Sequence, residues 1–280
     1  MEPIDIRKQR LKIENINALP TVPGTFKKIS AVLGKPGVTL DEISRFIAGD
    51  PALTTKVLKM VNSAAYGFPG RISSVSHAIM LLGLNVVKGL LLGVSVFEMM
   101  EKVMGGLWTH SLAVAAVARA VAERKGVKDP EEISIAGLLH DLGKVILMLE
   151  YQPLYEEAMA RAAAKQIPIA EAEQALFLEN HAAIGLWLAE KWHFPANLVE
   201  VIGYHHRPNA ARLAPMETAI VHFADILVRA RGAGYAGDSL VPVVHPAAFQ
   251  LLALKEADLR EILVKLEGSL DESDGPIFET

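Results

Sequence analysis

The apolar residues of this chain recur at spacings of three and four almost everywhere, and strict alternation over the length of a strand is hard to find. The first pattern places apolar side chains on one face of an α-helix, whereas a half-buried strand needs alternation. Helix start signals agree: Thr39 with Glu42 forms a capping box, and Asp50-Pro51 and Asp129-Pro130 each place a capping residue before a proline at the first helical position. The sequence predicts an all-α protein.

The predicted helices are 39–48, 50–61, 75–82, 85–100, 107–125, 131–141, 155–166, 169–178, 181–192, 195–205, 216–231 and 257–266. They suit a multi-helix bundle preceded by a helical N-terminal subdomain. Gly105-Gly106 is the best internal break. It divides an N-terminal helical half, 1–105, from a second half, 106–231, that holds most of the histidines. Residues 232–280 are predicted as a Gly- and Pro-rich loop followed by a short helix and a frayed acidic end.

The composition is that of a soluble globular protein: 51% of its 280 residues are apolar and the net charge is only −4. No basic arm or acidic tail indicates nucleic acid. The most apolar stretch, 81–97, is interrupted by Asn85 and Lys88 and is too short for a bilayer, so we expect a buried helix and no membrane. The charged N-terminus lacks the apolar core of a signal peptide, and we expect a cytoplasmic location.

The chain contains no cysteine, which excludes disulfides, zinc–thiolate sites, iron–sulfur ligation and thiol nucleophiles. A metal would have to be held by nitrogen and oxygen atoms. That ligand set suits iron, manganese, zinc or nickel and does not choose among them.

The octapeptide GLLHDLGK, 137–144, has two interpretations. It could be a helix end, with His140 complementing the helix dipole and Gly143 in a left-handed cap. It could also be part of a metal site, but one His-Asp pair supplies too few donor atoms, so partners are needed. The small Ala136 and Gly137, one turn earlier, would let another helix approach closely.

The candidate metal ligands are His110, His140, Asp141, His181, His205 and Asp225, with His206 as a further candidate. Each histidine could instead be an ordinary helix-end residue. Asp225 is harder to explain in that way because it interrupts an apolar helical face, where a buried carboxylate needs a partner. His77, His193 and His245 have no acidic or histidine companion, and we interpret them as surface or capping residues.

The order of these residues along the chain resembles the order found in a known family. A histidine, a His-Asp pair about thirty residues on and a later aspartate resemble the HD superfamily. In the first half, LPTVPGTFKKI, DEISRFIAGDPALTTKVLKMVNSAAYG and AIMLLGL are similar to the HDOD family, the HD-related output domain of bacterial signalling proteins. In the second half LWTHS, AGLLHDLGK, ENHAAIG and YHHRP follow in the same order, so the likeness extends over roughly 19–225.

The resemblance implies a regulatory or interaction module with a protein signalling partner. It also implies two divalent metal ions. His110, His140, Asp141 and Asp225 would hold one, and Asp141 would bridge to a second held by His181 and His205. His206 would support them or act as another ligand. Lys144 would orient a bridging water or a phosphate oxygen, and it is the one candidate catalytic residue.

Two departures from the related HD-GYP cyclic-di-GMP phosphodiesterases limit this likeness. Their paired histidines precede an acidic, glycine-rich stretch and a Gly-Tyr-Pro, where this chain has Arg207-Pro208-Asn209. Their three-metal members carry a glutamate where this chain has Gly106. We therefore expect neither cyclic-di-GMP hydrolysis nor a third metal.

Three functions remain open from the sequence. The first is a signalling output module whose metal serves structure or sensing. The second is a metal-dependent phosphohydrolase with a phosphoester or nucleotide ligand, in which two cations would activate water. The third is a diiron oxygenase, on the analogy of a distant branch of the superfamily. A hydrolase should have an open cleft with Lys144 or Arg207 facing the metals, whereas a module can bury them.

Overall fold

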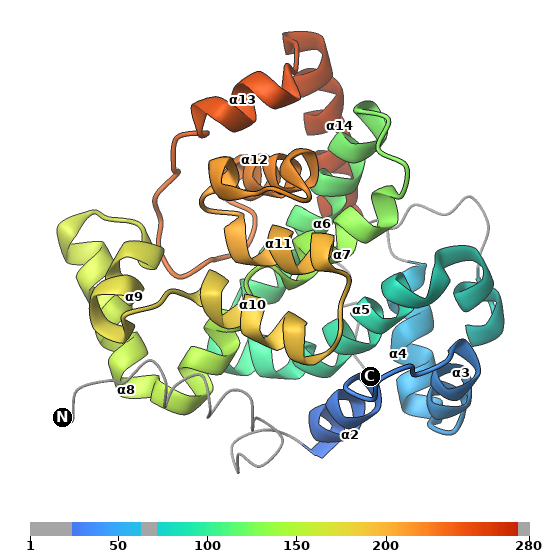
Figure 1. Cartoon of the computed structure of the whole chain (residues 1–280). Coiled ribbons are helices and arrows are strands. Elements are labelled where there is room, and N and C mark those ends of the chain that lie inside the picture. Colours follow the sequence, from blue (N-terminus) through green and yellow to red (C-terminus); the bar gives the residue numbers. More distant parts are fainter. Residues whose placement is uncertain (1–23, 63–71, 274–280) are drawn as a thin grey trace.

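The structure, a computed structural model, describes residues 24–62 and 72–273, and over these ranges it contains helices and no strand. The all-α prediction is confirmed. The helices, drawn in Figure 1, are α2 (Gly24–Leu33), α3 (Leu40–Ala48), α4 (Pro51–Val61), α5 (Val75–Val103), α6 (Leu107–Arg124), α7 (Pro130–Leu139), α8 (Leu142–Lys165), α9 (Ile169–Phe177), α10 (His181–Lys191), α11 (Ala196–Tyr204), η2 (Pro208–Ala210), α12 (Pro215–Arg231), α13 (Pro246–Leu252) and α14 (Glu256–Ser273).

The capped starts predicted for α3 and α4 are confirmed, whereas α7 begins at Pro130 as predicted but without a side-chain cap from Asp129. The Thr39 hydroxyl accepts a hydrogen bond from the Glu42 amide, and the Glu42 carboxylate accepts one from the Thr39 amide at 2.9 Å. The Asp50 carboxylate accepts from the amides of Ala52 and Leu53, both at 3.0 Å. These bonds satisfy amides that have no partner inside the first helical turn.

Several elements differ from the prediction, among them α2, which was not predicted. α5 joins the helices expected at 75–82 and 85–100, and Gly83, with φ at 77°, breaks it between them. α8 begins at Leu142 instead of 155, with a break at Tyr151 ahead of Pro153. The first half of α8 was missed because its residues from Leu142 to Met148 are all buried, so it has no polar face to make a periodic pattern. α13 was not predicted, and α14 is longer than expected.

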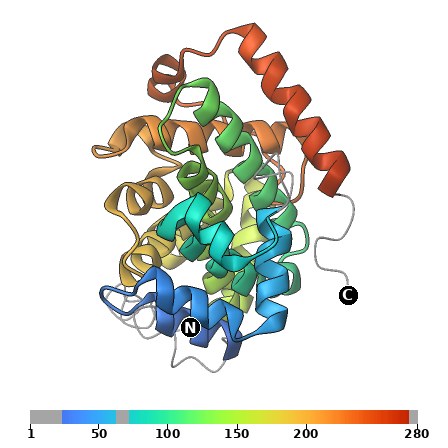
Figure 2. The same ribbon diagram turned by 90° about the vertical axis from the view of Figure 1, so that its right-hand side faces the viewer.

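The helices α6 and α7 pack against each other at the centre of the molecule, as Figure 1 shows. Gly137 permits this contact, because a Cβ atom there would lie 3.1 Å from the backbone of Ala115, as expected from its position one turn before His140. α12 packs on α6, and α10 packs on α8 and α11. α5 carries α2, α3 and α4 on one side and contacts α7 on the other. Figure 2 shows α14 running along the outside of the molecule.

The apolar stretch expected as a buried helix lies in α5. Its segment Val75–Ser95 is long and apolar enough to cross a membrane, but 72% of the most apolar window is buried inside the protein. That burial is typical of the core helix of a globular fold.

Asn62 ends α4 and ties it to the chain that precedes α5. Its side-chain amide donates to the carbonyls of Leu58 and Ile72, both at 2.8 Å, and its side-chain oxygen accepts from the Ile72 amide at 2.7 Å. The sequence VNSAAYG predicts that Asn62 and Ser63 end the preceding helix by bonding its last turn and the loop beyond, and these bonds confirm that role for Asn62. Ser63, predicted to share this role, lies outside the described residues.

We predict that Asn62→Ala lowers the free energy of unfolding by about 1–3 kcal/mol, because three hydrogen bonds of a half-buried group are lost together. Urea unfolding of the variant and the wild type measures the change. Asn85→Ala, which removes one half-buried bond to Glu132, is the matched control and should cost less. A smaller loss for Asn62→Ala than for Asn85→Ala would contradict the assignment.

Candidate metal centre

Four of the candidate ligands lie at helix ends that meet in the interior. His140 follows the last residue of α7, Asp141 precedes the first residue of α8, His181 begins α10 and His205 follows α11. A helix N-terminus favours a carboxylate, so the start of α8 suits Asp141. Because the four helix ends meet, the side chains at these ends can point toward one common position.

A helix does end within GLLHDLGK, at Leu139, but the left-handed cap predicted at Gly143 was wrong, because this glycine lies inside α8 without a positive φ. It is required for a different reason. A Cβ atom at Gly143 would lie 2.0 Å from the carbonyl oxygen of His181 and 3.0 Å from the Gly185 amide nitrogen. The glycine therefore lets the start of α10 reach the start of α8, which brings His181 to Asp141.

The side chains that were predicted as ligands come together in three overlapping groups, and each group offers nitrogen or oxygen atoms within 4.8 Å of one another. The groups are His110, His140 and Asp225; His140, Asp141 and His205; and His181, His205 and His206. All of these residues are buried except His206, which is half-buried. The structure thus unites every one of the predicted ligands in one buried cluster.

Asp141 lies between the groups. Its Oδ2 is 3.3 Å from His140 Nε2 and 3.7 Å from His110 Nε2, while its Oδ1 is 3.2 Å from His181 Nε2. Asp225, the carboxylate that needed a partner, has its Oδ1 3.2 Å from His110 Nε2. The two oxygens of Asp141 therefore face different sets of imidazoles.

Backbone carbonyls fix two of the rings. His140 Nδ1 is 2.6 Å from the Gly137 carbonyl oxygen, and His205 Nδ1 is 2.7 Å from that of Ile202. A carbonyl can only accept, so Nδ1 carries the proton in both rings. In the neutral ring Nε2 then keeps its lone pair, which is the arrangement of a metal-binding histidine.

Five buried polar atoms of this cluster have no hydrogen-bond partner: Nε2 of His110, His140 and His205, Oδ1 of Asp141 and Oδ1 of Asp225. Leaving such atoms unpaired in the interior is costly. A divalent transition metal would satisfy them, since the donors are imidazole nitrogens and carboxylate oxygens. The residues therefore fit a metal.

The charges of the cluster also suit a metal. Burial raises the pKa of Asp141, but His140 and Lys144 outweigh it and hold that pKa well below its ordinary value. Burial lowers the pKa of His205 and of His206 well below the ordinary histidine value. An ionised Asp141 beside neutral His205 and His206 suits cation binding, while Glu173, against the effect of burial, raises the pKa of His181.

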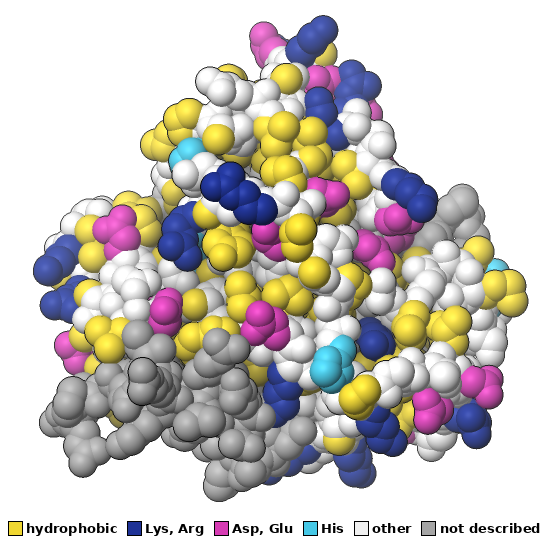
Figure 3. All heavy atoms as spheres, in the orientation of Figure 1, with side chains coloured by type: hydrophobic (Ala, Val, Ile, Leu, Met, Phe, Trp, Pro, Cys, Tyr) yellow, Lys and Arg dark blue, Asp and Glu magenta, His cyan; other side chains and the backbone are white. Residues whose placement is uncertain are grey.

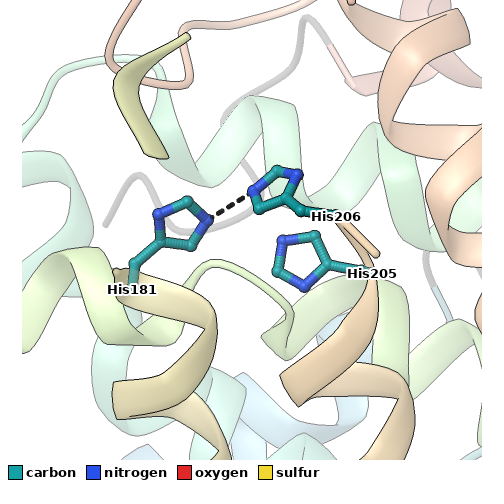
Figure 4. Close-up of side chains that lie close together, drawn as sticks. All are labelled: His181, His205 and His206. Atoms are coloured by element: carbon teal, nitrogen blue, oxygen red, sulfur yellow. Dashed lines mark hydrogen bonds between the residues drawn. The ribbon is translucent and has the colours of Figure 1, made fainter. Parts of the chain in front are cut away.

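His181 and His206 approach each other at the half-buried edge of the cluster. Their Nε2 atoms are 2.8 Å apart, and Figure 4 shows the two rings pointing toward one another with His205 beside them. Two imidazole nitrogens at this distance need a proton or a cation between them. His206 is therefore placed to act with His181 and His205.

Lys144 is fully buried beside Asp141. Its ammonium donates to Asp141 Oδ2 at 2.6 Å and to the carbonyl oxygen of Ala236 at 2.8 Å. The structure thus places this lysine against the ligand set, where its charge compensates the carboxylate. The role expected for it, orienting a water or a phosphate oxygen, stays a prediction.

Glu173 is the main residue of the site that sequence reasoning missed. Its Oε2 is 2.6 Å from His181 Nδ1 and accepts from the His181 amide at 2.8 Å, and Tyr155 donates to its Oε1 at 2.9 Å. The signal was available: Glu173 lies on the buried face of α9 that contains Ile169 and Ala172, as Asp225 does on α12. A buried carboxylate on an apolar helical face needs a partner, and here it orients the ring of His181, a candidate ligand.

His222 was also missed. Its Nδ1 is 2.7 Å from the carbonyl oxygen of His205, and its Nε2 accepts from the His245 amide at 2.9 Å. It lies three residues before Asp225 on α12 and supports the backbone at His205. His245 caps α13, while His77 and His193 are exposed, so the interpretation of these three as surface or capping residues is confirmed.

The surface agrees with the burial of the ligands. On the face drawn in Figure 3, histidine appears only in small, separate places among hydrophobic and charged side chains. No cluster of histidines opens onto that face.

The fold and this cluster define an all-helical protein with a buried His–Asp centre of the HD type. The family model for the HDOD domain matches residues 19–208, more than half of the chain. The protein therefore belongs to the HDOD family. Asp225 lies beyond the matched residues, although the structure brings it into the cluster.

Individual relatives agree with this assignment. The chain is 28% identical to an HDOD domain protein of unknown function from Geobacter sulfurreducens, whose crystal structure superimposes with a TM-score of 0.69 and covers 99% of this chain and 100% of that one. A presumed phosphohydrolase from Shewanella amazonensis SB2B shares the fold at 21% identity, with a TM-score of 0.62 over 93% of this chain and 97% of that one.

A protein of Treponema pallidum (strain Nichols), described as uncharacterized, is 29% identical over 238 residues, which are 81% of this chain and 46% of that protein. The chain thus spans about half the length of the curated relative that it matches.

We predict that Glu173→Gln weakens metal binding about 10- to 100-fold, because the variant loses the charge that orients His181. Competition with a chromophoric chelator of known affinity measures the change. Glu171→Gln, exposed on the same helix, is the matched control. Equal affinities for the two variants would show that Glu173 does not serve the metal.

Proposed function

We propose that this chain is a signal-transduction module of the HDOD type that carries a dinuclear metal centre. The position of Asp141 supports this proposal most directly. One of its oxygens faces His140 and His110, and the other faces His181. A carboxylate placed in this way can bridge two cations, as the resemblance to the two-metal branch implies.

The ligands then divide into two sets that share Asp141. His110, His140 and Asp225 would hold one cation, and His181 and His205, with His206 as a further ligand, would hold the other. Iron, manganese, zinc and nickel all suit these donors.

Burial of the ligands favours the module over an enzyme. The six proposed ligands other than His206 are at most 3% exposed, and Lys144 is as deeply buried. Arg207, the other basic residue expected to face the metals in a hydrolase, is exposed, and its guanidinium lies over the ring of Tyr204. A metal enclosed in this way would stabilise or switch the helical surface that a partner protein contacts.

A phosphohydrolase is the second candidate, and the complete ligand set favours it. When bound, two divalent cations would supply Lewis acidity and a water of lowered pKa. His206 is the half-buried member of the cluster, so it marks the edge at which a substrate would arrive. Lys144 would keep Asp141 ionised during the reaction through the ion pair between its ammonium and the carboxylate.

We predict that protein purified without chelator contains about two transition-metal ions per chain. Asp141→Asn should be the most damaging ligand substitution, because it weakens both sites and leaves the charges less compensated. Elemental analysis measures the content. Asp41→Asn, on the exposed side of α3, is the control and should keep the metals. Wild-type protein that takes up no metal even after reconstitution would refute this proposal.

For activity, we predict no fast hydrolysis of cyclic-di-GMP and at most weak hydrolysis of a simple aryl phosphodiester, because metals alone do not position a dinucleotide. Manganese- and iron-loaded proteins are assayed separately on both substrates, beside the Asp141→Asn variant. Fast cyclic-di-GMP cleavage that the variant loses would reverse the order of the two candidates. Inactivity on both substrates with metal bound supports the module.

A further inference from the structure

Residues 233–240, which we call the strap, connect α12 to the chain before α13 and lie beside the start of α6 and Lys144. In Figure 1 this segment runs from α12 toward α9 and turns back to α13. It contains no helix or strand, yet Ala233, Ala236 and Gly237 are buried. It also lies outside the residues that the family model matches. A loop without regular structure must satisfy its backbone through contacts with its surroundings, and here these are the ligand-bearing helices.

The strap is bonded to two of these helices near the ligands. The Tyr235 amide donates to the Gly106 carbonyl oxygen at 3.0 Å, at the start of α6 and one turn before His110. The Ala236 carbonyl oxygen accepts from the ammonium of Lys144, which also donates to Asp141. One lysine therefore links the strap to the carboxylate at the middle of the cluster.

Asp238 fastens the end of the strap to α9 and α12. Its carboxylate pairs with Arg229, one turn after Asp225 on α12, and accepts from the Leu240 amide at 2.8 Å. It also accepts from the amide of Ile169, the first residue of α9, at 2.8 Å. α9 carries Glu173 one turn later, so this single carboxylate joins the two helices that hold Asp225 and the partner of His181.

Gly234 allows the strap to lie directly against α6. Its φ is +70°, and a Cβ atom there would be 2.3 Å from the His110 backbone nitrogen and 2.4 Å from the Gly106 carbonyl oxygen. Another residue at this position would be strained and would push the strap away from His110.

We propose that the strap is a latched cover that controls exchange of the metals between the buried centre and solvent, with Asp238 as the latch. The inference rests on the proposed metal centre and adds its regulation. Loss of the Asp238 contacts frees the strap from α9 and removes its ion pair with α12, where the Leu240 carbonyl oxygen still accepts from Arg229 at 3.0 Å, while the hydrogen bonds inside both helices remain. The centre then opens without unfolding of the helices that supply its ligands.

The test compares metal loss from Asp238→Asn and wild-type protein, both fully loaded and mixed with excess chelator. We expect extraction about tenfold faster or more from the variant, since bonds to a charged group are weakened. Asp258→Asn is the matched control: Asp258 also pairs with an arginine, Arg124, but joins α14 to α6. Extraction from the control should proceed at the wild-type rate.

A second readout does not depend on metal. In metal-free protein, diethyl pyrocarbonate should modify His140 and His205 faster in Asp238→Asn than in wild type, as followed by peptide mass mapping. If the wild type takes up no metal, the proposed centre fails, and this rate still tests the cover. Gly234→Ala displaces the strap from α6 without changing Asp238. If Asp238→Asn does not fold, the extraction and modification rates of Gly234→Ala test the proposal. Unchanged extraction and modification rates in a folded strap variant would overturn the proposal.

Discussion

A buried carboxylate at the meeting point of several helices is the constraint on which this structure depends. Asp141 is almost completely excluded from water, and such a charge is tolerated only with close compensation. Lys144 supplies one positive charge at 2.6 Å, and the imidazoles around the carboxylate lower its pKa further. The buried nitrogen and oxygen atoms beside it have no hydrogen-bond partner, and a bound cation would be the simplest partner for them.

The helical packing follows from bringing these groups together. α6 and α7 form the central pair, and the ends of α7, α8, α10 and α11 supply four candidate ligands. Close approach is needed at each junction, so Gly137 and Gly143 lie where a methyl group would meet a neighbouring backbone. Carbonyls and Glu173 then orient the rings, and the strap closes the centre. Metal binding at this centre would therefore be coupled to folding through the same contacts.

Much of the fold, and the residues that meet in the cluster, could be predicted from the sequence because the signals are local. Capping residues marked α3, α4 and α7, and ligand-type residues interrupted apolar helical patterns. What could not be predicted depends on partners distant in sequence. The Ala236 carbonyl meets Lys144 from 92 residues away, and Asp238 meets the start of α9 from 69 residues away. The first half of α8 was missed for another reason, since a helix buried on all sides has no amphipathic pattern.

The buried His–Asp cluster is proposed to hold two metal ions, one on either side of Asp141. A crystal structure with anomalous scattering data collected at the absorption edge of the bound metal tests it most directly. We predict two anomalous peaks inside the cluster, one beside His110, His140 and Asp225 and one beside His181 and His205, with Asp141 between them. Anomalous peaks found only at the protein surface, with the cluster free of metal in fully reconstituted protein, would contradict it.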